Sequence, residues 1–599
     1  MRRILIVVLL GSLLAVPSGA RRTGPWPKEK AWEWYDSQPW IRGCNYMSAD
    51  CANRVDQWQE LGFEERWKTQ EEELSLAESI GFNTLRLIFA EEGFGVWYAD
   101  HDGFMERVER TLALCARHGM RAIIVLGNDC SRPRELWSFP TPGPQKYDWG
   151  YHGGRKQSQH GSFPNAVGYT VLDDPALAPL FYQMCREVIT KYKDDDRILF
   201  WDLWNEPGNN NRGKLTAVNL PKLFEIAWEI DPKQPLAADL WHNWFKDNQA
   251  GDLSDIISYH SYSPLETNKK IVADLRERYG RPIINTEWMA RILDCNIEDM
   301  YPWFEQQRIG CTMWGFVAGK YQTYEPWEGT WKQIESGKGK NYKITKWFHD
   351  LFRPSLRPYD PAEIEIIKHV NHQADMESGI AEGKSLRQKV GVSRKILSED
   401  IWNCVRRTSF DFEGYTACIV EPSIDAPEGS PWALTVSDPE LFPDRTGVLE
   451  LVRNGWHYAS IQAPEDVTAR FMRFVSSDLG LGGKAFVIGT GEEGKKAADL
   501  AYANRESVAA LYLDGPVLKK KEPSKLAGEL SKAGIPVLLM FGTMDKVASP
   551  EACAQFEEEF SKGGGNITTV RRELFGHYPL GLEAARVGII TSFVQAALK

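Results

Sequence analysis

What this 599-residue sequence lacks already narrows its possible roles. After the first 20 residues there is no run of about eighteen apolar residues, so no membrane span is expected. The net charge is −11, so the basic excess typical of nucleic-acid-binding proteins is missing. No Cys and His pairs have the spacing of a zinc site, and nothing else in the sequence calls for a metal or another cofactor.

Cysteine is present, but neither half of the chain can pair its cysteines completely. Seven of the ten cysteines precede residue 372 and three follow it. Cys115 and Cys185 fall on apolar faces of expected helices, which predicts thiols buried in the core. Cys44–Cys51 and Cys295–Cys311 remain conceivable disulfide bridges.

The N-terminus has the layout of a secretory signal peptide. Two arginines precede an apolar stretch over residues 4–16, and the small residues Ser18 and Ala20 close the segment. We therefore expect a signal peptide over residues 1–20, cleaved after Ala20, and a mature protein that is secreted or periplasmic.

Tryptophan is abundant, and 20 of the 23 tryptophans precede residue 372. Core packing accounts for most of them, but indole faces also suit the apolar faces of sugar rings. The same region, residues 31–372, alternates short apolar runs with longer helical patterns. This rhythm predicts a (β/α)8 TIM barrel. The eight expected strands are 40–47, 82–89, 121–129, 198–206, 235–241, 256–262, 282–288 and 312–319.

Polar residues at the ends of these strands are the catalytic candidates, because TIM barrels carry their reacting groups at the C-terminal ends of the strands. Two of them, Glu206 and Glu287, are carboxylic acids on opposite sides of the expected barrel mouth. Cleavage of a glycosidic bond needs one protonated and one ionised carboxyl group placed in this way. The full set of strand-end candidates is Asn45, Arg86, Asp129, Asn205, Glu206, Asp239, Trp241, His260, Tyr262, Glu287 and Trp314.

Four features in order carry a resemblance to a known family: Trp-Asn-Glu-Pro at 204–207, His260-x-Tyr262, Glu287 and Trp314. With them, residues 31–370 resemble the retaining β-glycosidases of the cellulase-like family 5 clan. The stretches "WDLWNEPGNN" and "NTEWMAR" further resemble a bacterial group commonly labelled β-xylanase. The resemblance implies that Glu206 is the general acid/base and Glu287 the nucleophile. Their carboxyl groups should then lie roughly 5–5.5 Å apart.

The resemblance also assigns roles to the neighbours of the two acids. Asn205 is expected to hold the sugar 2-hydroxyl, and Arg86 to lie beneath Glu287 and keep it ionised. Tyr262 would donate to Glu287, and His260 would contact Glu206 or the substrate. The apolar strand end and the nearby Glu287 are expected to keep Glu206 protonated. The remaining residues expected to bind substrate are Trp314, which would floor the subsite of cleavage, and Asn45, Asp129 and Trp241.

Residues 347–370 are expected to form the eighth helix and a closing segment of the barrel, and residues 373–398 a polar linker. The sequence pattern changes after this linker. Residues 399–599 alternate strands with helices, which predicts a three-layer α/β domain. They resemble the esterase-like domains of the α/β-hydrolase fold. The expected strands are 417–422, 431–436, 457–462, 484–494, 508–516, 536–545 and 569–577.

The nucleophile of this second domain is missing. Asp545 and His577 match the acid and the base of a hydrolase triad, but Gly491 stands where the family has serine. Glycine has no side chain with which to attack a carbonyl carbon, so a degenerate, catalytically silent domain is expected.

The sequence therefore predicts a secreted retaining β-glycoside hydrolase that acts on a plant-type or microbial β-glycan or oligosaccharide. One alternative is a bifunctional glycosidase and carbohydrate esterase, against which the missing serine argues. The other is a non-catalytic glycan-binding protein, against which the intact pair of Glu206 and Glu287 argues.

Overall fold

The computed structural model describes residues 22–148, 150–155, 166–241, 249–339, 341–379, 385–422, 424, 426–519, 521–577 and 584–598. The expected signal peptide lies outside the described residues. The chain forms two compact units, one of residues 1–296 and 309–359 and one of residues 297–308 and 360–599. Among the described helices, none is long and apolar enough to cross a membrane.

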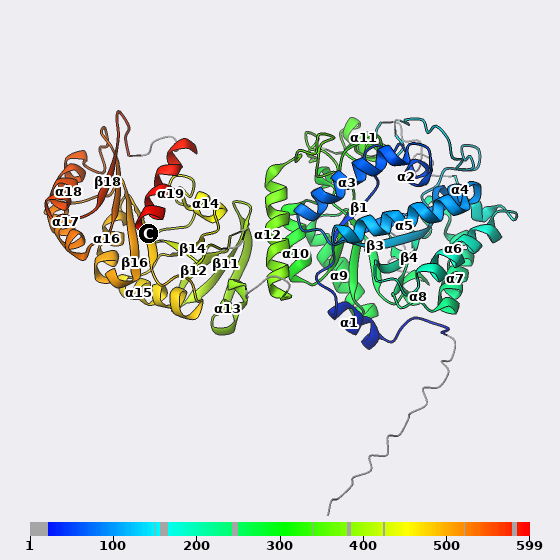
Figure 1. The fold of residues 1–599 in the computed structure, drawn as a ribbon, viewed down its shortest axis with the longest axis horizontal. Helices are drawn as coiled ribbons and strands as arrows, with labels where there is room; N and C mark the ends of the chain where they lie inside the picture. The colour runs from blue at the N-terminus through cyan, green and yellow to red at the C-terminus, as the bar shows by residue number, and fades with distance from the viewer. Residues whose placement is uncertain are drawn as a thin grey trace, which may run out of the picture. The chain divides into compact units, whose positions relative to one another are not determined.

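The first unit is built around a nearly closed parallel barrel (Figure 1). All eight expected strands have a counterpart, but the eighth lies earlier than the expected 312–319, at Gly310–Met313, because the chain leaves the sheet at Trp314. The fifth is broken at Ala238 into two short pieces. The first piece pairs with the strand before it and the second with the strand after it, so the break joins the two edges of the sheet. The strands, in the order β5-β4-β3-β2-β1-β9-β8-β7-β6, are β1 (Arg42–Asn45), β2 (Thr84–Ile88), β3 (Arg121–Asn128), β4 (Ile198–Asn205), β5 (Leu236–Ala237), β6 (Asp239–Leu240), β7 (Ile257–His260), β8 (Ile283–Trp288) and β9 (Gly310–Met313).

Helices cover the barrel on the outside. In α5, for example, Phe104, Val108, Leu112 and Cys115 recur at helical spacing on one buried face, and the Asp100 side chain caps the first turn. The helices of this unit are α1 (Lys28–Asp36), α2 (Arg54–Trp58), α3 (Phe63–Ser79), α4 (Ala90–Ala99), α5 (His101–Arg117), α6 (Ala178–Tyr192), α7 (Gly213–Ile230), α8 (Gln249–Leu253), α9 (Leu265–Tyr279) and α11 (Glu328–Glu335).

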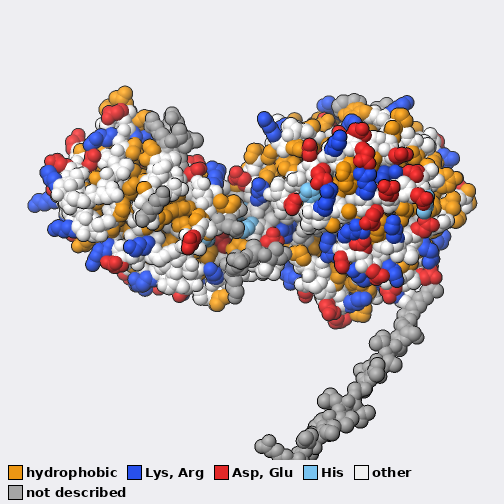
Figure 2. All heavy atoms as spheres, in the orientation of Figure 1, with side chains coloured by type: hydrophobic (Ala, Val, Ile, Leu, Met, Phe, Trp, Pro, Cys, Tyr) orange, Lys and Arg blue, Asp and Glu red, His pale blue; other side chains and the backbone are white. Residues whose placement is uncertain are grey.

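The outer face of this unit mixes both signs of charge. Figure 2 shows acidic and basic side chains interspersed over the side that carries α3 and α5. Two ion pairs, Arg110 with Glu64 and Arg117 with Glu71, join these two helices. On this face no large patch of one sign offers a binding surface for a highly charged polymer.

Strand register places the candidate residues at one level of the barrel. Asn45 is the register partner of Arg86, and Asn128 is the partner of Asn205. His260 on β7 is likewise the partner of Glu287 on β8. The C-terminal ends of neighbouring strands therefore bring these side chains to the same end of the barrel.

The predicted boundary between the two halves needs correction. Residues 347–358 contain no helix. The helix expected within 347–370 is α12 (Pro361–Glu377), which begins at Pro361 and groups with the second unit instead of closing the barrel. The expected linker 373–398 contains α13 (Leu386–Ser393), whose Leu386 and Val390 are buried in the core of the second unit. This polar stretch contains few apolar residues, so they do not form the amphipathic pattern that predicts a helix. Helix α10 (Ile297–Gln306) also groups with the second unit.

The second unit contains a mixed sheet in the order β10-β11-β12-β14-β13-β15-β16-β17-β18 (Figure 1). All seven expected strands are present, and the hairpin β10–β11 was not predicted. The strands are β10 (Ile396–Trp402), β11 (Val405–Phe412), β12 (Tyr415–Val420), β13 (Trp432–Thr435), β14 (His457–Ile461), β15 (Ala485–Thr490), β16 (Val508–Asp514), β17 (Val537–Gly542) and β18 (Ile567–Arg572).

Helices pack on both faces of this sheet, which confirms the three-layer prediction. Val487 belongs to one buried cluster, whereas its neighbours Phe486 and Ile488 belong to another on the opposite face. The further helices of this unit are α14 (Val448–Arg453), α15 (Glu465–Arg473), α16 (Glu493–Ala503), α17 (Glu522–Ala533), α18 (Pro550–Lys562) and α19 (Ala584–Leu598).

All ten cysteines are free thiols, so the two conceivable bridges are wrong. Cys51 instead donates its S–H to the Gln57 side chain, at 3.4 Å. The prediction that Cys115 and Cys185 are core thiols is confirmed, because both are completely buried.

Candidate active site

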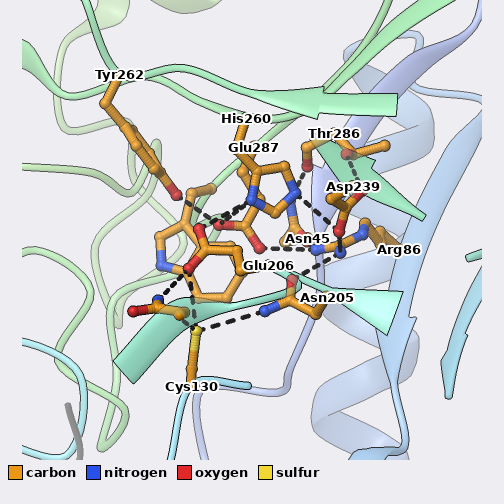
Figure 3. A network of polar contacts seen from close by, with 12 residues as sticks. Asn45, Arg86, Cys130, Asn205, Glu206, Asp239, His260, Tyr262, Thr286 and Glu287 are labelled. Atoms are coloured by element: carbon orange, nitrogen blue, oxygen red, sulfur yellow. Dashed lines mark hydrogen bonds and ion pairs between the residues drawn. The ribbon is translucent and has the colours of Figure 1, made fainter. Parts of the chain in front are cut away.

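The strand-end side chains converge on a cleft of about 660 Å³ at the mouth of the barrel. Glu206 is the first residue after β4, and Glu287 lies near the end of β8. Figure 3 shows the two carboxyl groups facing one another, with His260 beside both. One carboxylate oxygen of Glu206 and one of Glu287 lie within 4.8 Å of each other.

Two donors hold the carboxylate of Glu287. Arg86 Nη1 donates to Oε1 at 2.7 Å, and the Tyr262 hydroxyl donates to Oε2 at 2.8 Å. Burial raises the pKa of Glu287, whereas the positive charges of His260 and Arg86 act in the opposite direction. The carboxyl group thus has a fixed orientation and cationic neighbours that favour its ionised form, as a nucleophile requires.

Arg86 ties the base of the site together and is completely buried. Besides Glu287, its guanidinium donates to Asp202 at 2.9 Å and to Asp239 at 2.7 Å. It also donates to the amide oxygens of Asn45 and Asn205, both at 2.8 Å. Arg86 therefore contacts Glu287 as expected, and it also contacts four further polar residues that were not expected as its partners.

The surroundings of Glu206 are polar, which corrects the expectation of an apolar environment. Asn209 Nδ2 donates to Oε2 at 2.6 Å, and the Cys130 thiol donates to the same oxygen at 3.0 Å. His260 Nδ1 lies 3.0 Å from Oε1. The apolar run before Glu206 packs in the core, but Glu206 has a φ of +46°, so the chain turns at this residue and the carboxyl group reaches other loops.

His260 links the two acids to the base of the site. Its Nε2 lies 3.1 Å from Asp239, and its Nδ1 lies 3.5 Å from Glu287. Burial acts to lower the pKa of His260, but Asp239 and Glu287 outweigh it and raise that pKa to about 10. These acidic neighbours favour the protonated form of His260. Glu206, His260 and Glu287 lie close enough together to surround a cation, but both ring nitrogens of His260 already face carboxylate oxygens.

Four predicted binding residues differ in how they relate to the cleft. Trp314 and Trp241 line it, and Trp314 Nε1 donates to His152 at 2.8 Å. Asn45 instead faces the network below, where its amide donates to the Thr286 carbonyl at 2.7 Å. The structure does not bring Asp129 into the cleft lining.

Asp129 is buried beside the loop that follows Glu206. It accepts hydrogen bonds from the Gly208 backbone at 2.6 Å, from Arg212 Nε at 2.8 Å and from the Thr216 hydroxyl. Burial raises its pKa, and Arg212 opposes the shift. These contacts fix the turn that carries Glu206, so the geometry gives Asp129 a supporting position rather than contact with a ligand.

The second unit brings its three triad positions together. His577 Nδ1 lies 2.8 Å from Asp545 Oδ2, and Asp545 Oδ1 accepts from the backbone of Val547 and Ala548. Gly491 forms the sharp turn between β15 and α16, with a φ of +54°. A Cβ atom added to Gly491 would lie 3.4 Å from His577 Nε2. The glycine therefore stands where a hydrolase of this type has its nucleophile.

Residues 52–320 match the model of the cellulase family, glycosyl hydrolase family 5. The barrel domain belongs to this family. It is thus a glycosidase domain, and its substrate is a carbohydrate. Glu206 and Glu287 both lie within the matched residues.

No curated protein matches the chain. Among solved structures, a candidate dipeptidyl aminopeptidase IV from Bacteroides ovatus is 12% identical, covers 32% of this chain with 35% of its own length, and has a TM-score of 0.27. Est1E from Butyrivibrio proteoclasticus is 14% identical, with coverages of 32% and 97% and a TM-score of 0.26. TT1662 from Thermus thermophilus is 14% identical, with coverages of 33% and 98% and a TM-score of 0.27.

Several residues that line the family 5 cleft were not predicted. Asn209 follows Glu206 by three residues in the same turn, a spacing that could have suggested it. Cys130 follows the predicted strand end Asp129 directly, but a cysteine without metal-site or disulfide spacing gives no sequence signal of a place in a cleft. His152, Tyr321 and Trp327 lie on loops, where neither periodicity nor a strand end marks a residue.

Proposed function

We propose that the family 5 barrel hydrolyses β-glycosidic bonds with net retention, with Glu287 as nucleophile and Glu206 as general acid/base. The observation that carries the proposal is the approach of the two carboxyl groups to within 4.8 Å. Retaining glycosidases have their carboxyl groups about 5–5.5 Å apart, whereas inverting enzymes leave about 6.5–9.5 Å for a water molecule. The different partners of the two acids support the division of roles.

In the first step, Glu287 attacks the anomeric carbon while Glu206 gives its proton to the glycosidic oxygen. The bond between that carbon and oxygen breaks, the leaving group departs as an alcohol, and the sugar becomes an ester of Glu287. Arg86 and Tyr262 hold the attacking carboxylate in place. Asn205, which lines the cleft and whose amide oxygen accepts from Arg86, would hold the sugar 2-hydroxyl.

In the second step, Glu206 is ionised and removes a proton from water, which attacks the same carbon and releases Glu287 as a carboxylate. The product keeps the β configuration because the anomeric carbon is inverted twice. Trp314 supports a stacked sugar here, since its indole lines the cleft.

The substrate proposed is a plant-type or microbial β-glycan or an oligosaccharide derived from it. The volume of the cleft, about 660 Å³, supports a substrate longer than one sugar. We further propose that the protein acts outside the cytoplasm, after cleavage at Ala20.

The test uses the purified full chain and nitrophenyl β-glycosides of xylose, glucose and cellobiose. Proton NMR of the first-formed product should show the β anomer. Glu287→Gln should abolish turnover on each active substrate, and Glu266→Gln, an exposed acid on α9, serves as the matched control. A first-formed α anomer would establish inversion and refute the proposed mechanism.

A second variant separates the roles of the two acids. Glu206→Ala should lower turnover of an alkyl glycoside by roughly 10²–10⁴-fold, because its leaving group needs a proton. A dinitrophenyl glycoside should still form the glycosyl-enzyme, and azide should then release it as the β-glycosyl azide. Equal losses on both substrates, with no azide product, would contradict the role given to Glu206.

A further inference from the structure

Cys130 lies in contact with the acid/base residue of the proposed mechanism. It comes two residues after the end of β3, and its backbone N–H donates to Asn128 Oδ1 at 3.0 Å, which fixes the start of the loop. The side chain is half-buried and lines the cleft. Its Sγ lies 3.0 Å from Glu206 Oε2 (Figure 3).

The sulfur has amide partners that fix its position. Asn209 Nδ2 donates to Sγ at 3.2 Å, and Asn205 Nδ2 approaches it at 3.6 Å. Asn209 also donates to Glu206 Oε2, so the amide, the thiol and the carboxylate form a closed set of contacts. The thiol therefore has one geometry in which its own hydrogen points at Glu206.

We infer that Cys130 is a positioning residue that shifts the equilibrium between the protonated and ionised forms of Glu206. This inference rests on the proposed function. An S–H bond to a carboxylate favours the ionised acid, which is the form that removes a proton from water in the second step. A thiol can also accept a hydrogen bond, so it can stay in contact with Glu206 when that residue is protonated. The nitrogen of Asn209 can only donate and cannot adapt in this way.

The thiol keeps its hydrogen under working conditions. Burial, and next the negative charge of Glu206, raise the pKa of Cys130 well above its ordinary value. Cys130 is thus a neutral donor rather than a reactive thiolate. Its contribution to the site is a hydrogen bond and not covalent chemistry.

Other groups also face Glu206, and they set the background for any pH effect. Glu287 lies within 4.8 Å, His260 Nδ1 lies at 3.0 Å, and Tyr262 reaches the site from the loop after β7. The buried charges of Arg86 and Asp239 lie below them. The hydrogen bonds that the structure shows for Cys130 are with Glu206, Asn205, Asn209 and Asn128, so changing the thiol leaves the contacts of these other groups in place.

The experiment compares Cys130→Ala and Cys130→Ser in the full chain with wild type. The control is Cys404→Ala, which changes the other half-buried cysteine and lies in the second unit. The measurement is kcat/KM against pH on an alkyl or nitrophenyl glycoside, whose alkaline limb reports loss of the acid's proton. We expect Cys130→Ala to move this limb to higher pH by roughly half a unit, the scale of one weak hydrogen bond to a charged group.

The Cys130→Ser variant and a second substrate distinguish an effect of Cys130 on Glu206 from a purely structural role. A serine hydroxyl is a stronger donor, so Cys130→Ser should return the limb to the wild-type pH or below it. With a dinitrophenyl glycoside, bond cleavage needs no proton, and single-turnover formation of the glycosyl-enzyme should show no shift. Thermal unfolding of each variant checks that it is folded.

Two results would overturn the inference. One is a Cys130→Ala profile that coincides with wild type and Cys404→Ala. The other is an equal fall in kcat for Cys130→Ala and Cys130→Ser with the alkaline limb unmoved, which would mean a structural role alone. Wild-type protein that cleaves no glycoside would instead refute the proposed function on which the inference rests.

Discussion

Replacing Arg86 by methionine should be one of the most damaging single changes in the barrel. Its guanidinium is completely buried and lies 2.7–2.9 Å from oxygen atoms of Asp202, Asp239 and Glu287. Removing one member of a buried ion pair costs about 3–5 kcal/mol, because the remaining charge has no compensation. Here three carboxyl groups lose their shared partner, and His260 offsets only part of that loss.

The expected loss of about 3–5 kcal/mol in the free energy of unfolding can be measured by urea denaturation at pH 7. Burial acts to raise the pKa of Asp239, but His260 and Arg86 together lower it. Stability from a depressed carboxyl pKa is present above the unfolded value of about 3.9 and is lost as the pH falls through the folded value. The difference in the free energy of unfolding between Arg86→Met and wild type should therefore become smaller below about pH 4.

Arg212→Met provides the matched comparison. Arg212 is also completely buried, and it pairs with Asp129 at 2.8 Å and Asp173 at 2.5 Å. Both variants should lose comparable stability, but only Arg86→Met removes a direct contact with Glu287. A loss below about 1 kcal/mol for Arg86→Met would refute the account, since the median exposed ion pair contributes that little.

Three further predictions follow from individual contacts. The pKa of His260 is raised to about 10, so the stabilisation from its positive charge is complete below about pH 6.5 and is lost as the pH approaches 10. Between these pH values the free energy of unfolding of wild type should fall with pH, by up to about 1.4 kcal/mol per unit, and His260→Gln should lack this fall. Asp129→Asn should lower the unfolding temperature with little change in KM, and an increase in KM alone would show contact with substrate. In full-length Glu287→Gln, hydrolysis of nitrophenyl acetate should not change when His577→Ala is added; a decrease would reveal an active second unit.

The barrel could be predicted because its strands are short apolar runs bounded by turns. The same reasoning failed at 396–412, where β10 and β11 form a hairpin whose Asn403 and Cys404 have φ values of +49° and +71°. Two adjacent left-handed residues form a tight hairpin turn. The second of them is usually glycine, and cysteine at this position does not predict such a turn. The alternating pattern of β11, with Phe410 and Phe412 buried, was the better clue.

The candidate site was predictable to the extent that strand ends define it. Glu287, His260 and Tyr262 follow directly from that rule. Tyr262 donates to Glu287 and His260 lies beside Glu206, as the resemblance implies. The rule does not extend to side chains that act on the strand-end residues from neighbouring loops. Asn209 and Cys130 belong to this class, because only the folded turn brings them to Glu206.

Glu206 and Gly491 occupy the same kind of position in two different sheets. Each is the first residue after a parallel strand, each takes a left-handed φ, and each is placed opposite a histidine from another loop or strand. The conformation costs a non-glycine residue about 1–2 kcal/mol, whereas glycine adopts it freely. Glu206 therefore has a strained backbone conformation that a glycine at the same position would avoid. Strain of this kind persists where the side chain at that position is needed. At Gly491 the strain is relieved and the side chain is lost, although Asp545 and His577 still meet at 2.8 Å. The backbone of the second unit thus has the shape of a nucleophile turn without a side chain, whereas the turn in the barrel presents the carboxyl group of Glu206 to the cleft.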